Sequence, residues 1–264
     1  MPFEGLILLT TLIVTLSIFA LIWAVHIPKK DVGIIDLYWG PGFAVIALIT
    51  FISGGHHTPL HIFFLTTTIV YGLRLGWHLT RRHMSCVKED RRYAHMRSNA
   101  GPSFWWNSLF KIFLLQAVLM WLIATPQHLG FLYSSDQIAT YEHFIFFTGL
   151  TAFIVGFLFE TIADWQLSQF KNKEENHNQT MSQGLWAYSR HPNYFGEVVL
   201  WWGFGLMGYA LSSSILALIG PALLTFLILK VSGVTMLEKH LGPEKAGYDA
   251  YIKKTSAFFP LRPK

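Results

Sequence analysis

The stretch YSRHPNYFGEVVLWWGFG, Tyr188–Gly205, begins with charged and titratable side chains and continues as an apolar run with two adjacent tryptophans. The whole chain of 264 residues is similarly apolar, with 52% hydrophobic and 13% charged side chains. Soluble domains carry roughly a quarter of charged residues, so this composition predicts an all-α membrane protein. The polar start of Tyr188–Gly205 then needs a reason, because ionisable groups in a membrane span are costly unless they face a cavity or a partner.

Seven apolar stretches are long enough to cross a hydrocarbon core of about 30 Å. The second and the sixth are short and interrupted by glycine. The predicted spans are Gly5–Val25, Leu37–Ile52, Leu60–Leu79, Trp105–Ala124, Phe144–Gln166, Tyr194–Leu211 and Ser214–Val231. The first is too long for a signal-peptide core and no small-residue cleavage pattern follows it, so we expect it to be retained.

The basic residues alternate between loops, which predicts an orientation. Lys and Arg follow the first, third, fifth and seventh spans, whereas the other loops, such as His56–Pro59 and Pro126–His143, have none. Because basic loops stay in the cytosol, we expect the N-terminus outside and the C-terminus in the cytosol. The net charge of +5 is explained by this topology and does not indicate a nucleic-acid partner. No repeat or composition shift divides the chain, so residues 1–264 are predicted to form one transmembrane domain.

Three of the predicted spans carry polar side chains near their cytosolic ends, three or four positions apart and therefore on one helix face. These stripes are Tyr71, Arg74, His78, Arg81 and Arg82 on the third span, Glu160 and Asp164 on the fifth, and Asn193, Glu197 and Trp201 on the sixth. Ion pairing between helices would explain the carboxylates, and snorkelling to lipid phosphates would explain the outermost arginines. Three polar faces at one membrane depth favour a ligand cavity instead.

Arginines mixed with carboxylates and an amide suit a cytosolic ligand that has phosphate and ribose groups. Guanidinium groups bind phosphate in a bidentate manner, and Asp, Glu and Asn bind hydroxyl and amide groups. The chain has no Gly-x-Gly-x-x-Gly turn, no Gly-Lys-Ser/Thr loop and no His-Glu-x-x-His metal motif. The residues expected to bind the cofactor are Arg74, His78, Arg81, Arg82, Asp164, Lys171, Tyr188, Arg190, His191, Asn193 and Glu197. A lipid-soluble substrate would enter the deeper, apolar part of the cavity from the bilayer, so membrane lipid is an expected neighbour of the site.

Several motifs resemble the steroid 5-alpha-reductase-like membrane reductases, in particular the bacterial branch described as a domain of unknown function, DUF1295. The likeness runs from about Asp36 to Pro260 and is most specific over Asp164–Gly203. Its motifs are SRHPNYFGEVVLWWG, ETIADWQLSQF, YGLRLGWHLTRR, EDRRY and YDAYIKKTSAFFP. The resemblance implies seven transmembrane helices that enclose NADPH, reduction of an activated carbon–carbon double bond in a lipophilic 3-oxo-4-ene steroid or similar molecule, and a place in the bacterial inner membrane.

The resemblance also implies roles for single residues of the cofactor site. The family's Asn-x-x-Gly-Glu falls on Asn193, Gly196 and Glu197, which implies a clamp on the nicotinamide amide. Asp164 is similar to the acidic residue that holds polar atoms of the cofactor. His240 stands about where the family has a histidine that contacts the cofactor.

On the substrate side, Tyr71 and Arg74 match a Tyr-x-x-Arg of the family's third helix, so Tyr71 resembles the group that polarises the substrate carbonyl. The family's Gln-Glu pair on an early helix is missing, and its nearest counterpart is DLYWG, which contains Asp36. Asp36 is therefore expected to support Tyr71 or to replace the missing glutamate. The expected catalytic residues are Tyr71, Asp36 and Glu197, and the steroid itself stays open as a substrate.

The Arg-His-Pro-x-Tyr-x-Gly element, Arg190–Gly196, is also similar to membrane methyltransferases of the isoprenylcysteine carboxyl and phospholipid types, which bind S-adenosylmethionine. Glu197 directly after Gly196, and the acidic Asp164, favour the reductases. The arginines of the third span do so too, because S-adenosylmethionine has no phosphate. A lipid-binding or transport protein without chemistry is a third reading of the intramembrane charges.

Overall fold

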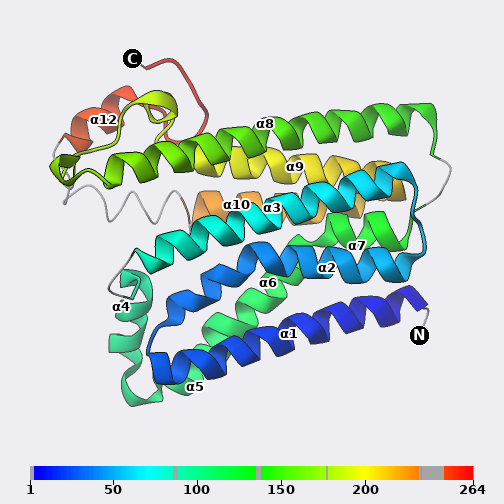
Figure 1. Ribbon diagram of the computed structural model, residues 1–264, viewed down its shortest axis with the longest axis horizontal. Coiled ribbons are helices and arrows are strands. Elements are labelled where there is room, and N and C mark those ends of the chain that lie inside the picture. Colours follow the sequence, from blue (N-terminus) through cyan, green and yellow to red (C-terminus); the bar gives the residue numbers. More distant parts are fainter. Residues whose placement is uncertain are drawn as a thin grey trace. The chain divides into compact units, whose positions relative to one another are not determined.

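The computed structural model describes residues 3–85, 89–134, 138–176, 178–231, 233 and 247–263, and these residues form helices and connecting segments without a β-strand (Figure 1). The predicted all-α fold is confirmed. The chain forms two compact units. Unit 1 comprises Met1–His143 and Gly208–Ala217, and unit 2 comprises Phe144–Met207 and Leu218–Lys264. The single domain predicted from composition stays a prediction.

Each of the seven predicted spans corresponds to a helical segment. In chain order these are α1 (Phe3–Lys29), η1 with α2 (Val32–Tyr38, Trp39–Gly54), α3 (Pro59–Met84), α5 with η3 and α6 (Phe104–Ser108, Leu109–Leu114, Leu115–Ile123), α8 (Thr140–Lys171), α9 (Pro192–Ser212), and η6 with α10 and η7 (Ile215–Leu218, Ile219–Phe226, Leu227–Val231). The sixth span, which looks short in the sequence, belongs to a helix of 21 residues.

Four helical stretches of the described residues are long and apolar enough to cross a membrane: Phe3–Lys29, Val32–Gly54, Arg92–Ile123 and Thr140–Lys171. Ile215–Val231 is a shorter apolar helix. The two other predicted spans lie in α3 and α9, the helices that carry most of the predicted polar stripes. The chain is therefore a polytopic α-helical membrane protein, and its orientation stays a prediction.

The prediction of a loop at Pro126–His143 is wrong in part. Residues Thr125–Leu132 form the helix α7, and α8 already begins at Thr140. Pro126 stands in the first turn of α7, where a proline costs no hydrogen bond, and most of the helix is buried. Two further helices were not predicted from the sequence: α4 (Arg91–Ala100), which follows the third predicted span, and α12 (Tyr248–Lys254), which follows the seventh.

In unit 1, α2 lies beside α3, and both are drawn in blue to cyan in Figure 1. Glycine allows the two backbones to approach closely. A Cβ atom at Gly40 would lie 2.3 Å from the carbonyl oxygen of Gly72 and 2.7 Å from the nitrogen of Gly76. Small residues at such positions are typical of helix pairs in membranes, because they allow close van der Waals packing.

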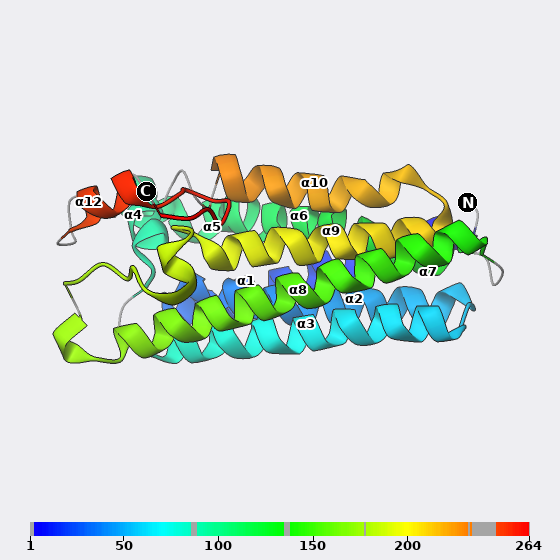
Figure 2. The same cartoon turned by 90° about the horizontal axis from the view of Figure 1, so that it is seen from above.

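In unit 2, α8 and α9 run side by side and antiparallel (Figure 2), and glycines of both helices lie in the interface. A Cβ at Gly149 would meet the carbonyl oxygen of Gly203 at 2.8 Å, and one at Gly156 would meet that of Gly196 at 2.5 Å. The aromatic rings of Phe153 and Phe204 pack between the helices with centroids 5.1 Å apart. This contact fixes the register of the polar residues at the ends of both helices.

Candidate functional site

The polar stripes of α8 and α9 meet in unit 2. The side-chain amide of Asn193 donates a hydrogen bond of 3.1 Å to Oδ1 of Asp164, and Asp164 is only 7% exposed. Glu160, one turn deeper on α8, is also buried, and Gly196 packs against its backbone. A buried carboxylate hydrogen-bonded to a half-buried amide can bind the hydroxyl and amide groups of a ligand.

The segment that precedes α9 carries three further predicted residues. His191 is buried and its ring stacks on that of Tyr194, with centroids 5.7 Å apart. Arg190 donates from Nη1 to the backbone oxygens of Ile252 and Thr255, at 3.1 and 2.7 Å. Tyr188 is exposed and its backbone oxygen accepts from Leu261. The structure thus gives Arg190 a role in holding α12, beside any ligand contact.

The remaining predicted residues of unit 2 lie near these groups in sequence and on the same helices. Glu197 is half-buried on α9, one turn after Asn193, and Lys171 is exposed at the last residue of α8. His240 lies outside the described residues. The structure brings together Asp164 of the α8 stripe and Asn193 of the α9 stripe, and the convergence of all three stripes stays a prediction.

The third stripe lies in unit 1 on α3. Tyr71 is fully buried, and its ring lies 6.4 Å from that of Phe43 on α2. Arg74 and His78 are half-buried on the same helix. Whether this stripe meets the α8–α9 pair, as the sequence analysis expects, stays a prediction.

The outermost arginines of α3 differ in their contacts. The guanidinium carbon of Arg81 lies 5.9 Å from the centre of the Trp77 ring, and the indole itself is 67% exposed. Arg82 lies 4.0 Å from a carboxylate oxygen of Asp90, with most of its side chain exposed. Both arginines therefore remain accessible to an anion from the surrounding solvent.

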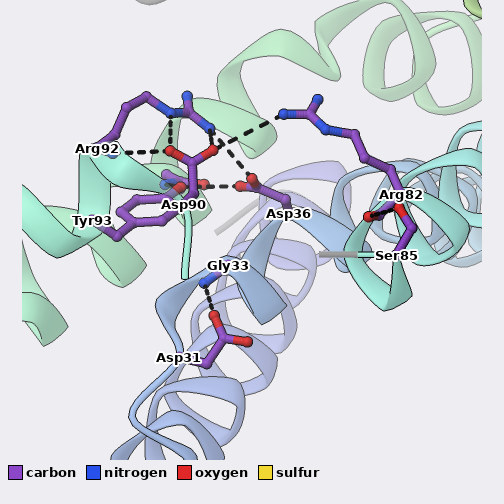
Figure 3. Close-up of polar contacts among 9 residues, drawn as sticks. Asp31, Gly33, Asp36, Arg82, Ser85, Asp90, Arg92 and Tyr93 are labelled. Atoms are coloured by element: carbon purple, nitrogen blue, oxygen red, sulfur yellow. Dashed lines mark hydrogen bonds and ion pairs between the residues drawn. The ribbon is translucent and has the colours of Figure 1, made fainter. Parts of the chain in front are cut away.

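A polar cluster that the sequence analysis did not expect surrounds Asp36 in unit 1 (Figure 3). The phenol of Tyr93 on α4 donates a hydrogen bond of 3.0 Å to Oδ1 of Asp36, and Nη2 of Arg92 lies 3.6 Å from Oδ2. The Gln116 amide donates to the Tyr93 oxygen at 3.4 Å and accepts from the indole of Trp39 at 2.8 Å. These hydrogen bonds join η1, α2, α4 and α6 in a series that runs from the Trp39 indole through Gln116 and Tyr93 to the Asp36 carboxylate.

Beside this cluster lies a cavity of about 80 Å³. It is lined by Gly33, Asp36, Leu37, Leu79, Arg82, His83 and Asp90. Its size and the polar groups among its otherwise apolar walls suit a few water molecules, since one needs at least roughly 10–15 Å³ of such space. The His83 imidazole at its rim lies 3.1 Å from Oδ2 of Asp31.

Two carboxylates connect α4 to the rest of unit 1. Glu89 accepts from the backbone nitrogen of Val32 at 2.9 Å and from two nitrogens of Arg97 at 2.8 and 3.1 Å. Burial alone would raise the pKa of Glu89, but the hydrogen bonds from Arg97 and Val32 outweigh it and hold the pKa below its usual range. The pKa of Asp90 is lowered in the same way, because hydrogen bonds from Arg92 outweigh its partial burial.

A family model described as protein of unknown function (DUF1295) matches residues 22–255 of this chain. The chain belongs to that family. The predicted resemblance to the DUF1295 branch of the steroid 5-alpha-reductase-like proteins is thereby confirmed.

Curated relatives are distant. An uncharacterized protein of Schizosaccharomyces pombe is 26% identical over 194 residues, which are 65% of this chain and 55% of the relative. Proteins named 3-oxo-5-alpha-steroid 4-dehydrogenase 1 are 32% identical in Mus musculus, over 40% of this chain and 43% of the relative, and 31% identical in Rattus norvegicus, over 33% and 32%. The chain thus spans about half or less of these relatives, and no solved structure matches it.

Proposed function

We propose that this protein is an NADPH-dependent reductase of the bacterial inner membrane that reduces an activated carbon–carbon double bond in a lipophilic substrate. The observation that carries the proposal is the hydrogen bond between the buried Asp164 and the half-buried Asn193, which joins the two motifs in which the resemblance to the steroid reductases is most specific. The names of the mammalian relatives support the same reaction class. An enone drawn from membrane-soluble steroids or isoprenoids is the proposed substrate.

The chemistry of the donor set fits a nicotinamide dinucleotide. Asp164 and Asn193 would hold the amide and hydroxyl groups, with Glu197 one turn away on α9. Lys171 and Arg190 near the same ends of α8 and α9 would neutralise phosphate charge. When bound, NADPH supplies the hydride that the double bond accepts.

The substrate carbonyl is polarised by a side chain of the protein. Tyr71 would donate a hydrogen bond to the carbonyl oxygen and so stabilise the negative charge that develops there as the β-carbon accepts hydride. The proton that completes the reduction comes from water and is added at the α-carbon. Asp36 contacts Tyr93 and Arg92, so we propose that it orders α4 near the substrate rather than acting alone.

Ligand binding and turnover test the proposal directly. The protein in detergent should be stabilised by NADPH and not by S-adenosylmethionine, and a ligand at about 100 times its dissociation constant adds roughly 2.7 kcal/mol. Oxidation of NADPH in the presence of a 3-oxo-4-ene steroid or an isoprenoid enone should follow. Methyl transfer from labelled S-adenosylmethionine would favour the methyltransferase reading, and binding of neither cofactor would favour a lipid-binding protein.

A further inference from the structure

The segment that leads into α9 is held by the end of the chain within unit 2. We name residues 248–263 the C-terminal strap and residues 184–191 the pre-α9 loop. Backbone hydrogen bonds link the two: the nitrogen of Arg190 donates to the oxygen of Ser256 at 2.8 Å, and that of Leu261 donates to the oxygen of Tyr188 at 3.0 Å. Ser189 and Ser256 form a parallel β-bridge.

Buried hydroxyl groups strengthen this connection. The fully buried Ser189 donates from Oγ to the backbone oxygen of Phe258 at 2.7 Å and accepts from the nitrogen of His191 at 3.1 Å. The phenol of Tyr251 donates to the backbone oxygens of Trp186 and Ser189, at 2.5 and 3.3 Å. Burial raises the pKa of Tyr251, so its hydroxyl stays protonated and remains a donor.

Arg190 contributes a charged contact. Its guanidinium donates to two carbonyl oxygens at the C-terminal end of α12, Ile252 and Thr255. Carbonyl groups at a helix C-terminus lack partners within the helix and carry partial negative charge, so a cation there is favourable. The strap also packs its Phe258 ring against Phe195 of α9, with centroids 5.7 Å apart.

The opposite side of the pre-α9 loop is fixed to α8. The Gln166 side chain accepts from the nitrogen of Leu185 at 3.0 Å, and the indole of Trp186 donates to the oxygen of Ala163 at 3.0 Å. Gly184 has a positive φ of 60°, and a Cβ there would lie 2.4 Å from the Gln166 amide. The loop is therefore clamped between α8 and the strap.

We infer that the C-terminal strap is a positioning element for the ligand groups of α9: through Ser189, Arg190 and Tyr251 it holds the loop in the conformation that places His191 and Asn193. This role rests on the proposed function, because the ligand that it serves is NADPH. Pre-organisation raises affinity, since the apparent dissociation constant is the intrinsic one divided by the fraction of molecules in the competent state.

Ser189→Ala combined with Tyr251→Phe tests the clamp in the full chain. Neither side chain is among the groups proposed to bind the ligand, and both donate to backbone oxygens of the loop or the strap. Each substitution should speed local opening about fivefold, hence roughly 25-fold together. Hydrogen exchange of the amides of residues 185–191, measured in detergent without any cofactor, should accelerate by that factor. Arg262→Gln, an exposed change on the same strap, is the control that should leave exchange unchanged.

The NADPH dissociation constant of the double variant should rise, because the fraction of molecules in the competent state falls as opening increases, while kcat at saturating NADPH stays at the wild-type value. Unchanged loop exchange, or faster exchange with an unchanged dissociation constant in a wild type that binds NADPH, would overturn the positioning role alone. Wild-type protein that binds no NADPH would overturn the proposed function, and with it the role of the strap. A fall in kcat at an unchanged dissociation constant would also overturn the positioning role of the strap, since that result would show that the loop acts in the chemical step.

Discussion

Gly196→Ala should separate α8 from α9 and break the polar contact at their ends. A Cβ at Gly196 would lie 2.5 Å from the nitrogen of Glu160 and 2.7 Å from the carbonyl oxygen of Gly156, and both are backbone atoms that cannot rotate away. Ordinary contact begins near 3.4 Å, so the helices must move apart by about 0.9 Å at this point. A shift of that size lengthens the 3.1 Å hydrogen bond between Asn193 and Asp164 beyond the bonding range.

The free-energy change has three contributions. Overpacking costs about 1–3 kcal/mol, and the lost hydrogen bond costs about 1 kcal/mol. Alanine regains about 1 kcal/mol of helix propensity over glycine. The net loss of about 1–3 kcal/mol should lower the unfolding temperature by roughly 3–10 °C for a chain of this size.

Thermal unfolding followed by tryptophan fluorescence in detergent measures this loss. Val155→Ile is the matched control, because it adds a methyl group beside Gly156 on a side chain that is 52% exposed. Gly156→Ala, whose Cβ would lie 2.4 Å from the nitrogen of Leu200, should behave like Gly196→Ala. If Gly196→Ala unfolds at the temperature of the wild type and of Val155→Ile, the close packing of α8 on α9 is refuted.

Three further predictions concern chemistry, pH and topology. Tyr71→Phe should leave NADPH affinity unchanged and lower turnover about 100-fold, whereas Glu197→Gln should weaken NADPH binding by about 1.5–3 kcal/mol; equal effects on both quantities would contradict these roles. Because its pKa is lowered on folding, ionised Glu89 stabilises the protein at pH values above 4.5, its ordinary pKa. This stabilisation is lost as the pH falls through the lower pKa of the folded state, so acid should lower the unfolding temperature of wild type more than that of Glu89→Gln. Reporter fusions after Asn176 should be cytosolic and those after Ser135 external, and a cytosolic signal at Ser135 would reverse the orientation.

The helices were predictable because their signal is local. An apolar run of bilayer length identifies α1 and α8 without knowledge of any partner, and the i, i+4 spacing of polar residues identifies the faces of α8 and α9 that meet. The segment Pro126–His143 was predicted as a loop between two apolar spans, and most of the helix α7 lies within it. In the structure α7 is buried beside α2, where tertiary contacts decide its conformation.

The contacts around Asp36 and Ser189 could not be predicted because they join distant parts of the chain. Tyr93 is 57 positions from Asp36, and Phe258 is 69 positions from Ser189. No periodicity relates such pairs, and Tyr93 in the EDRRY motif has the same local signature as any surface tyrosine. The only available signal was the presence of EDRRY and the YDAYIKKTSAFFP ending among the motifs of the resemblance, which pointed to these segments but gave neither their partners nor their roles.

Two contacts in neighbouring parts of the chain hold Asn193 in place, and they make its position sensitive to substitutions at other residues. Gly196 sets the distance between α8 and α9 three residues after it, and Ser189 attaches the loop to the strap four residues before it. Because both act on the same short segment, their effects on hydrogen exchange should not add. Once Gly196→Ala has broken the hydrogen bond between Asn193 and Asp164, Ser189→Ala should accelerate exchange less than it does in the wild type. Hydrogen exchange of residues 185–191 in Gly196→Ala, Ser189→Ala and the combined variant measures that coupling. Additive effects would show that the helix interface and the strap are separate structures.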